Sequence, residues 1–312
     1  MRISVSAWDP GYAGAGDRAS ESSRAQLDVD LEAVAEAWRP VSVSAGAAPP
    51  RVLLVDGVRR LDARVDVAVT GQPPAPGLCA SYAAGVVVCD LAGPTPAARL
   101  AVAQVERGLF STVPDAGLSA GRMAQYPARL VDGVDPGDLI NAVQTRLTGV
   151  EITVAARAQP RPEDLLVVDG ALRGRDNLSR AVGYIKSHQR RYLPEALSSV
   201  VEDLEPGQRT PVFLLGTTWQ RHSWYLRLPG GGPGPWAGIA RLEASADLHI
   251  DTVVELANAS AAVLPRLASS PHKDPRAPQN LTPIAGLERR LRASLGDARL
   301  ILRRLRVDAA VA

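Results

Sequence analysis

Residues Leu165–His188, LLVVDGALRGRDNLSRAVGYIKSH, hold the clearest structural signal in this sequence. The first four residues are apolar and lead into Asp169 and Gly170, the pattern of a buried strand that ends in a turn. A second apolar run, AVGYI, follows and leads into Lys186 and then His188. The stretch therefore predicts two buried strands, of which the first delivers a carboxylate and the second a lysine.

A similar pattern occurs earlier in the chain, where four apolar residues, Val52–Val55, run into Asp56 and Gly57. If the two aspartate-bearing strands are neighbours, Asp56 and Asp169 converge at one edge of a sheet. Close like charges cost free energy unless a cation lies between them, so a divalent metal site is the leading hypothesis. The alternative is that both Asp-Gly pairs only end strands, since these residues are common in turns.

The overall composition restricts the class of protein. The 312 residues carry 35 basic and 33 acidic side chains, so the net charge of +2 indicates no polyanionic partner by itself. Cys79 and Cys89 fit neither a disulfide framework nor a CxxC site, and we expect buried thiols in a reducing cytoplasm. There is no basic-then-apolar leader and no window of about 18 apolar residues, so secretion and membrane spanning are not expected.

Two regions are predicted, an N-terminal arm and helix over residues 1–50 and a main domain over residues 51–312. Residues 1–20 are polar and rich in glycine, which suits an arm or a first edge strand. From Glu21 the apolar residues recur every three to four positions, which predicts a helix that stops at Pro40. The apolar face of this helix would hold Leu27, Leu31, Val34 and Trp38.

The main domain is expected to open with an antiparallel meander and to continue with a helix. The segments expected as strands are 51–56, 61–70, 78–91 and 99–110, of which the last also suits a helix. A helix that opens at Pro136 places Glu151 at the border of its apolar face, from which the carboxylate would reach over the sheet edge. The β-branched residues around Glu151 leave a strand as the alternative. The apolar face holds Leu139, Val143, Leu147, Val150 and Val154.

The rest of the chain alternates between predicted strands and helices. After the two strands of the opening stretch, strands are expected over 211–215, 222–228 and 236–243, and helices over 194–201, 252–267 and 284–306. Arg299, Arg303 and Arg306 share one face of the final helical region and either face solvent or contact nucleic acid. The pattern predicts an α/β fold with a central mixed β-sheet flanked by helices.

Lys186 begins a basic cluster that continues to Arg191 and includes His188. Such a cluster beside a carboxylate site is suited to contact the phosphates of a nucleic acid, while a solvated strand end is the alternative. No GxxxxGK[ST] motif occurs, so ATP hydrolysis is not expected. A restriction-type nuclease core has an acidic residue two positions before its lysine. Tyr184 occupies that position before Lys186, which argues for a different nuclease geometry.

The order of an Asp-Gly pair after a first strand, a glutamate on a helix, LLVVDGALR and then AVGYIKS resembles the NurA nuclease family. The resemblance covers most of residues 51–291. It implies an RNase H-like fold and a nuclease that degrades DNA with Mn²⁺ or Mg²⁺. It also implies a homodimer that processes DNA ends together with a hexameric HerA-type ATPase.

Carried across by position, the family's two aspartates fall on Asp56 and Asp169, and its glutamate falls on Glu151, with Glu106 as a poorer alternative. The family's C-terminal signature, a tyrosine before a proline-containing turn and a histidine eight residues later, is not kept. Asn280 and Glu288 hold those two places around Pro283, and His272 lies in the preceding loop. The resemblance therefore leaves open whether Asn280 and Glu288 take over those roles.

The expected activity is that of a metal-dependent DNA nuclease, a single-strand endonuclease and 5'-3' exonuclease in recombinational repair. Asp56, Glu151 and Asp169 would hold one or two cations, with Glu288 as a weaker fourth ligand, and Lys186 would neutralise charge on the phosphate. One alternative is a non-catalytic adaptor of the same fold that docks on an ATPase ring. Another is an RNA-directed hydrolase.

Overall fold

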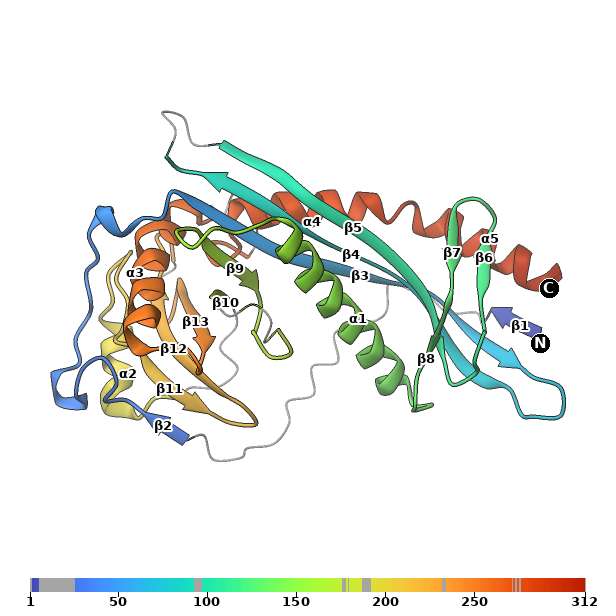
Figure 1. The fold of residues 1–312 in the computed structure, drawn as a ribbon, viewed down its shortest axis with the longest axis horizontal. Helices are drawn as coiled ribbons and strands as arrows, with labels where there is room; N and C mark the ends of the chain where they lie inside the picture. Colours follow the sequence, from blue (N-terminus) through green and yellow to red (C-terminus); the bar gives the residue numbers. More distant parts are fainter. Residues whose placement is uncertain are drawn as a thin grey trace.

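The structure, a computed structural model, describes residues 2–5, 26–92, 97–175, 178, 180–186, 192–231, 234–270, 272, 274 and 276–311. It confirms an α/β fold in which helices cover both faces of a large mixed sheet (Figure 1). From one edge to the other, the strands are β2 (Gln26–Asp28), β11 (Phe213–Gly216), β12 (Gln220–Arg227), β13 (Ile239–Ser245), β10 (Ala181–Ile185), β9 (Leu165–Asp169), β3 (Arg51–Ala68), β4 (Ala75–Asp90), β5 (Ala97–Ser111) and β8 (Ala128–Leu130). β1 (Arg2–Val5) pairs with β3. Within the described residues, no helix has the length and apolarity that a membrane span needs.

Three long antiparallel strands form the expected meander and run along the length of the molecule (Figure 1). They are β3 (Arg51–Ala68), β4 (Ala75–Asp90) and β5 (Ala97–Ser111). Segment 99–110 is therefore a strand, as expected. Cys79 and Cys89 both lie on β4 as free thiols, and their predicted burial is confirmed.

The prediction that Asp56 and Gly57 end a strand is wrong, because β3 continues through them as one strand of 18 residues. Gly57 serves close packing instead: a β-carbon there would lie 2.5 Å from Glu151 Oε1 and 2.7 Å from a methyl carbon of Leu147. Both neighbours belong to α1 (Pro136–Arg157), which packs on this face of the sheet. The glycine thus lets the helix approach β3.

The stretch that follows α1 folds as expected. β9 (Leu165–Asp169) and β10 (Ala181–Ile185) are parallel neighbours, and β9 is also parallel to β3. Gly170 turns the chain at the end of β9 with a φ of +118°, which suits a residue without a β-carbon. The expected apolar face of α1 is buried against the sheet, through Leu139, Val143, Leu147, Val150 and Val154.

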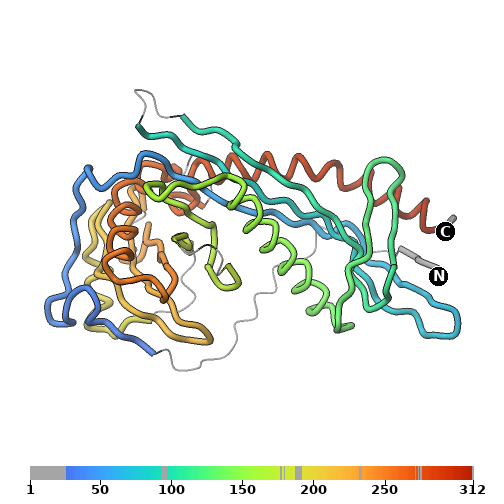
Figure 2. The backbone as a smooth tube through the Cα atoms, viewed as in Figure 1, coloured from blue at the N-terminus to red at the C-terminus, as the bar shows by residue number. Residues whose placement is uncertain are grey.

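The remaining elements extend the sheet and cover it. The strands are β6 (Leu118–Ala120), β7 (Ala124–Tyr126), β8 (Ala128–Leu130), β11 (Phe213–Gly216), β12 (Gln220–Arg227) and β13 (Ile239–Ser245). The helices are α2 (Glu195–Glu202), α3 (Ile250–Leu267), α4 (Thr282–Ser294) and α5 (Ala298–Val311). Gly296, with a φ of +79°, separates α4 from α5, so the predicted final helical region is divided in two (Figure 2).

The helix predicted between Glu21 and Pro40 is absent from the described residues of that segment. They form β2 (Gln26–Asp28), which pairs with β11, and one short 3-10 helix, η2 (Ala35–Ala37). A second 3-10 helix, η3 (Ala45–Ala47), follows after Pro40. β2 therefore belongs to the same sheet as β11, and the predicted helix is wrong for the described residues 26–40.

A largely buried ion pair ties this segment to the strand region around β11. The Arg209 guanidinium, whose side chain is 1% exposed, donates to both carboxylate oxygens of Glu32 at 2.7 and 2.8 Å. Glu32 also accepts the backbone N–H of Val212 at 2.7 Å. Trp38 packs against Phe213, with ring centroids 6.0 Å apart. Tertiary contacts thus override the helical periodicity of the sequence.

Replacing Glu32 with alanine leaves the buried Arg209 guanidinium without its carboxylate. Loss of one partner of a buried pair is expected to lower the free energy of unfolding by about 3 kcal/mol. Urea denaturation measures the change. Glu36→Ala, on an exposed residue of η2, is the matched control and should change stability by less than about 0.5 kcal/mol. Equal effects of the two variants would contradict the role given to this pair.

Candidate metal centre

Three carboxylates from three separate elements converge in the folded chain. Asp56 comes from β3, Asp169 from the end of β9 and Glu288 from α4, and one oxygen of each lies within 4.8 Å of the others. The parallel register pairs Val55 with Val168, so the next residue of each strand is an aspartate. The predicted convergence of Asp56 and Asp169 is therefore confirmed, and it follows from the pairing of β3 with β9.

Glu288 reaches the two aspartates because α4 packs closely on the face of the sheet that also holds Val52 and Leu54. Gly85 of β4 lies directly across from Asp56 in the strand register. A β-carbon at Gly85 would lie 3.0 Å from Leu287 of α4 and 3.0 Å from a backbone oxygen of β5. The missing side chain lets α4 come near β3. No sequence pattern had marked this glycine.

Asp56 carries an unsatisfied polar atom. Its Oδ1 accepts the backbone N–H of Gly57 at 2.7 Å, while its Oδ2 is buried and has no hydrogen-bond partner. Burial raises the pKa of Asp56 well above its ordinary value, and the charges of Asp169 and Glu288 raise it further. A buried oxygen without a partner costs free energy, and a cation bound by the three carboxylates would remove that cost. This donor set suits a hard divalent ion.

Lys186 lies at the cluster, as expected from its place after β10. Its Nζ donates to Asp169 Oδ2 at 2.5 Å and to Asn280 Oδ1 at 2.8 Å. Burial raises the pKa of Asp169, and the charge and hydrogen bond of Lys186 oppose that shift. The rest of the predicted basic cluster, residues 187–191, lies outside the described residues.

Glu151 does not join the three carboxylates. It lies on α1, which covers the face of the sheet opposite α4. The prediction that its carboxylate reaches over the sheet edge to the aspartates is therefore wrong. Arg175 binds its Oε2 through two nitrogens, of which Nε is 3.0 Å away. Burial raises the pKa of Glu151, and Arg175 opposes the rise. Sequence reasoning missed Arg175, which has no motif to mark it.

Asn280 and Glu288, the two positions that the sequence resemblance left open, both lie at the site. Asn280 is fully buried and bridges Lys186 to Asp274, since its Nδ2 donates to Asp274 Oδ2. Glu288 is a member of the cluster and accepts from Arg276 at 2.9 and 3.3 Å. His272 is exposed, with its Nε2 3.5 Å from Ser270 Oγ.

The alternative glutamate, Glu106, lies two strands away from β3. It is on β5, where Gln104 donates to it at 2.7 Å. The structure thus gives it no place in the cluster, which includes only three of the acidic residues that the structure describes. Arg299, Arg303 and Arg306 are exposed on α5, which packs on β1 and β6 at the far end of the molecule from α3 (Figure 1).

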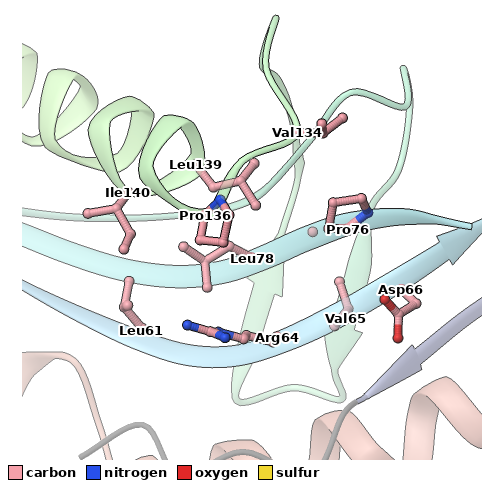
Figure 3. Close-up of a pocket in the computed structure, with 11 residues that line it drawn as sticks. Leu61, Arg64, Val65, Asp66, Pro76, Leu78, Val134, Pro136, Leu139 and Ile140 are labelled. Atoms are coloured by element: carbon pink, nitrogen blue, oxygen red, sulfur yellow. The ribbon is translucent and has the colours of Figure 1, made fainter. Parts of the chain in front are cut away.

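An apolar pocket lies between the start of α1, the C-terminal part of β3 and the N-terminal part of β4 (Figure 3). Pro136 and Ile140 of α1 line it together with Leu61 and Leu78 of the strands. Its volume is about 140 Å³, well below the roughly 300 Å³ at which small-molecule sites begin. None of the three clustered carboxylates lines it, so it is separate from the candidate metal centre.

Comparison of the chain with models of protein families gives no match. Comparison with curated proteins gives none either. The function of the site is therefore inferred from its own residues and their geometry.

The raised pKa of Asp56 makes cation binding depend on pH. The folded metal-free chain keeps a proton that the unfolded chain releases near its ordinary pKa of 3.8. The contribution of this proton to the free energy of unfolding is fully present below about pH 4. It is lost as the pH rises through the raised pKa of Asp56. Cation binding needs the ionised carboxylate. The rise in melting temperature caused by Mn²⁺, relative to EDTA, should therefore be small at about pH 5 and grow towards about pH 8.

Asp56→Asn is the matched variant for this thermal-shift measurement. Asparagine is neutral at every pH, so the variant avoids the cost of keeping Asp56 either protonated or charged in its buried place. The metal-free variant should therefore melt about 2 °C higher than the unchanged chain at neutral pH, equivalent to about 1 kcal/mol. It should also show no Mn²⁺-dependent shift at any pH. A Mn²⁺ effect that survives in this variant, or that does not vary with pH, would count against the assignment of Asp56.

Proposed function

We propose that this chain is a divalent-metal-dependent deoxyribonuclease that hydrolyses phosphodiester bonds at the Asp56, Asp169 and Glu288 cluster. The observation that carries the proposal is the buried Asp56 Oδ2, which has no hydrogen-bond partner and lies beside two further carboxylates. Purely structural carboxylates are paired or hydrogen-bonded when buried. Three carboxylates that lie this close together are suited to bind Mn²⁺ or Mg²⁺.

The sheet order supports an RNase H-like assignment within the α/β class. The central part runs β5-β4-β3-β9-β10, in which β3 to β5 form an antiparallel meander. α1 then leads to β9, which adds to the other side of β3 in parallel, and β10 adds parallel to β9. Asp56 and Asp169 thereby lie side by side near the middle of the sheet, where an RNase H-like nuclease would carry its acidic residues.

The proposed chemistry assigns a separate task to each side chain. Bound divalent ions would lower the pKa of a water molecule and stabilise the oxygen that leaves the phosphate. The pairing of β3 with β9 holds the carboxylates of Asp56 and Asp169 in place. α4 adds the carboxylate of Glu288. Lys186, whose side chain is 20% exposed, supplies positive charge beside Asp169. Glu151 stays with Arg175 and is left out of the ligand set.

The resemblance to the NurA nucleases supplies the biological part of the proposal. The substrate is then single-stranded DNA or DNA ends, cut as by an endonuclease and a 5'-3' exonuclease during recombinational repair. The partners are a hexameric HerA-type ATPase and a second copy of the chain in a homodimer. The place of action is the cytoplasm.

A non-catalytic adaptor that docks on an ATPase ring is the second candidate. It is favoured by the two cations that already neutralise the cluster: Lys186 on Asp169 and Arg276 on Glu288. Such pairs would let the carboxylates remain buried without a metal ion. The adaptor predicts neither Mn²⁺ binding nor cleavage, so one experiment separates the two candidates.

That experiment incubates the purified chain with single-stranded DNA in Mn²⁺ and in EDTA, beside an RNA of the same sequence. We expect cleavage of DNA in Mn²⁺ only. Asp169→Asn should lower the rate by more than about 100-fold, the upper end of the loss from an outer-sphere partner of a metal. Glu106→Gln, on the rejected alternative glutamate, should keep the rate within about twofold of the unchanged chain.

Two results would overturn the proposed function. The first is a chain that binds no Mn²⁺ and leaves DNA intact, which is the outcome expected of an adaptor. The second is a folded Asp169→Asn variant with full activity. Preferential cleavage of the RNA would keep the metal centre and change the substrate class.

A further inference from the structure

A chain of polar contacts joins the two ends of the metal centre. Lys186 connects Asp169 to Asn280, and Asn280 donates to Asp274. Arg276 follows in the same loop, with its Nε 3.8 Å from Asp274 Oδ1, and binds Glu288 of the cluster. One cation thus lies at each end of the site: Lys186, which Asn280 contacts, and Arg276.

The two cations are placed differently. The side chain of Lys186 is 20% exposed and its Nζ is shared between two acceptors of the interior. The Arg276 side chain is 54% exposed and directs both terminal nitrogens to Glu288, whose own side chain is 15% exposed. Arg276 therefore lies where the centre meets solvent.

Arg276 and a divalent ion compete for the same carboxylate. Its two nitrogens lie 2.9 and 3.3 Å from the two oxygens of Glu288, so both oxygens already have a donor. A metal ion bound by Glu288 needs at least one of these oxygens, and the positive charges repel each other. Metal binding therefore weakens the hold of Glu288 on the guanidinium.

We propose that Arg276 is a phosphate-binding residue of this centre, kept on Glu288 in the metal-free chain and passed to a DNA phosphate once a divalent ion takes the carboxylate. The fork of a guanidinium matches two phosphate oxygens as well as two carboxylate oxygens, which makes the exchange geometrically simple. The inference rests on the proposed nuclease function and adds a substrate-binding residue to it. It links DNA binding to metal loading, because Arg276 becomes available only when the ion is present.

The test uses Arg276→Gln and measures binding rather than cleavage. Calorimetry without DNA should show that the variant binds Mn²⁺ about two- to fivefold more tightly, since a half-exposed ion pair no longer competes. Binding of a hydrolysis-resistant phosphorothioate oligothymidine is then measured over a range of salt concentrations. In Mn²⁺ the slope of log K against log salt should fall by about 0.7, the value for one lost single-strand phosphate contact. In EDTA the slope should equal that of the unchanged chain.

Arg290→Gln is the matched control, because Arg290 is exposed on α4 and points about 200° around the helix from Glu288. It should leave Mn²⁺ affinity unchanged and should show no difference in slope that depends on Mn²⁺. Arg276→Lys should keep the slope while binding the oligonucleotide more weakly, since lysine offers a point charge and no fork.

Unchanged Mn²⁺ affinity in Arg276→Gln, or an unchanged slope in Mn²⁺, would overturn the inference while the unchanged chain still binds Mn²⁺ and cleaves DNA. The proposed function would then stand. Failure of the unchanged chain to bind Mn²⁺ would overturn both.

Discussion

Repulsion among three close carboxylates, of which Asp56 is buried and the other two are partly buried, is the constraint on which the site depends. Asp56, Asp169 and Glu288 bring oxygens within 4.8 Å of one another at a place where burial raises the pKa of both aspartates. Such an arrangement is unfavourable unless protons, basic side chains or a metal ion offset the charge. The structure supplies Lys186 and Arg276 in the metal-free state and leaves Asp56 Oδ2 without a partner.

Backbone packing holds the carboxylates in place against this repulsion. The parallel pairing of β3 and β9 fixes the two aspartates side by side, and the residues that it joins, Val52–Val55 and Leu165–Val168, are all buried. Gly85 on one face and Gly57 on the other let α4 and α1 approach β3 closely. A larger side chain at either position would push a helix outwards, since dense interiors tolerate added volume poorly. Two glycines on neighbouring strands thus set how closely α1 and α4 approach the sheet.

Local sequence predicted the elements whose patterning agrees with their packing. The apolar run before Asp169, the glycine after it and the amphipathic face of α1 each gave the right element, because burial and periodicity point the same way there. The Asp56-Gly57 pair was misread as a turn, since the sequence does not distinguish a glycine needed for a turn from one needed for helix packing. The predicted N-terminal helix failed because Glu32 is held by Arg209, which lies 177 positions away.

The site was predicted only in part, for a related reason. Asp56, Asp169 and Lys186 stand at the ends of pairing or buried segments that the sequence reveals. Arg175 and Arg276 lie in loops without periodicity, and their partners are fixed by tertiary structure. Glu151 was placed on the correct helix, but the face of the sheet that α1 covers depends on the whole fold.

Crystals soaked in Mn²⁺ and measured by anomalous diffraction test the central claim most directly. The account predicts an ion bound by oxygens of Asp56, Asp169 and Glu288 at roughly 2.0–2.5 Å, with Asp56 Oδ2 among the ligands. An ion held by Glu151 instead, or no ion at this cluster at saturating Mn²⁺, would contradict it.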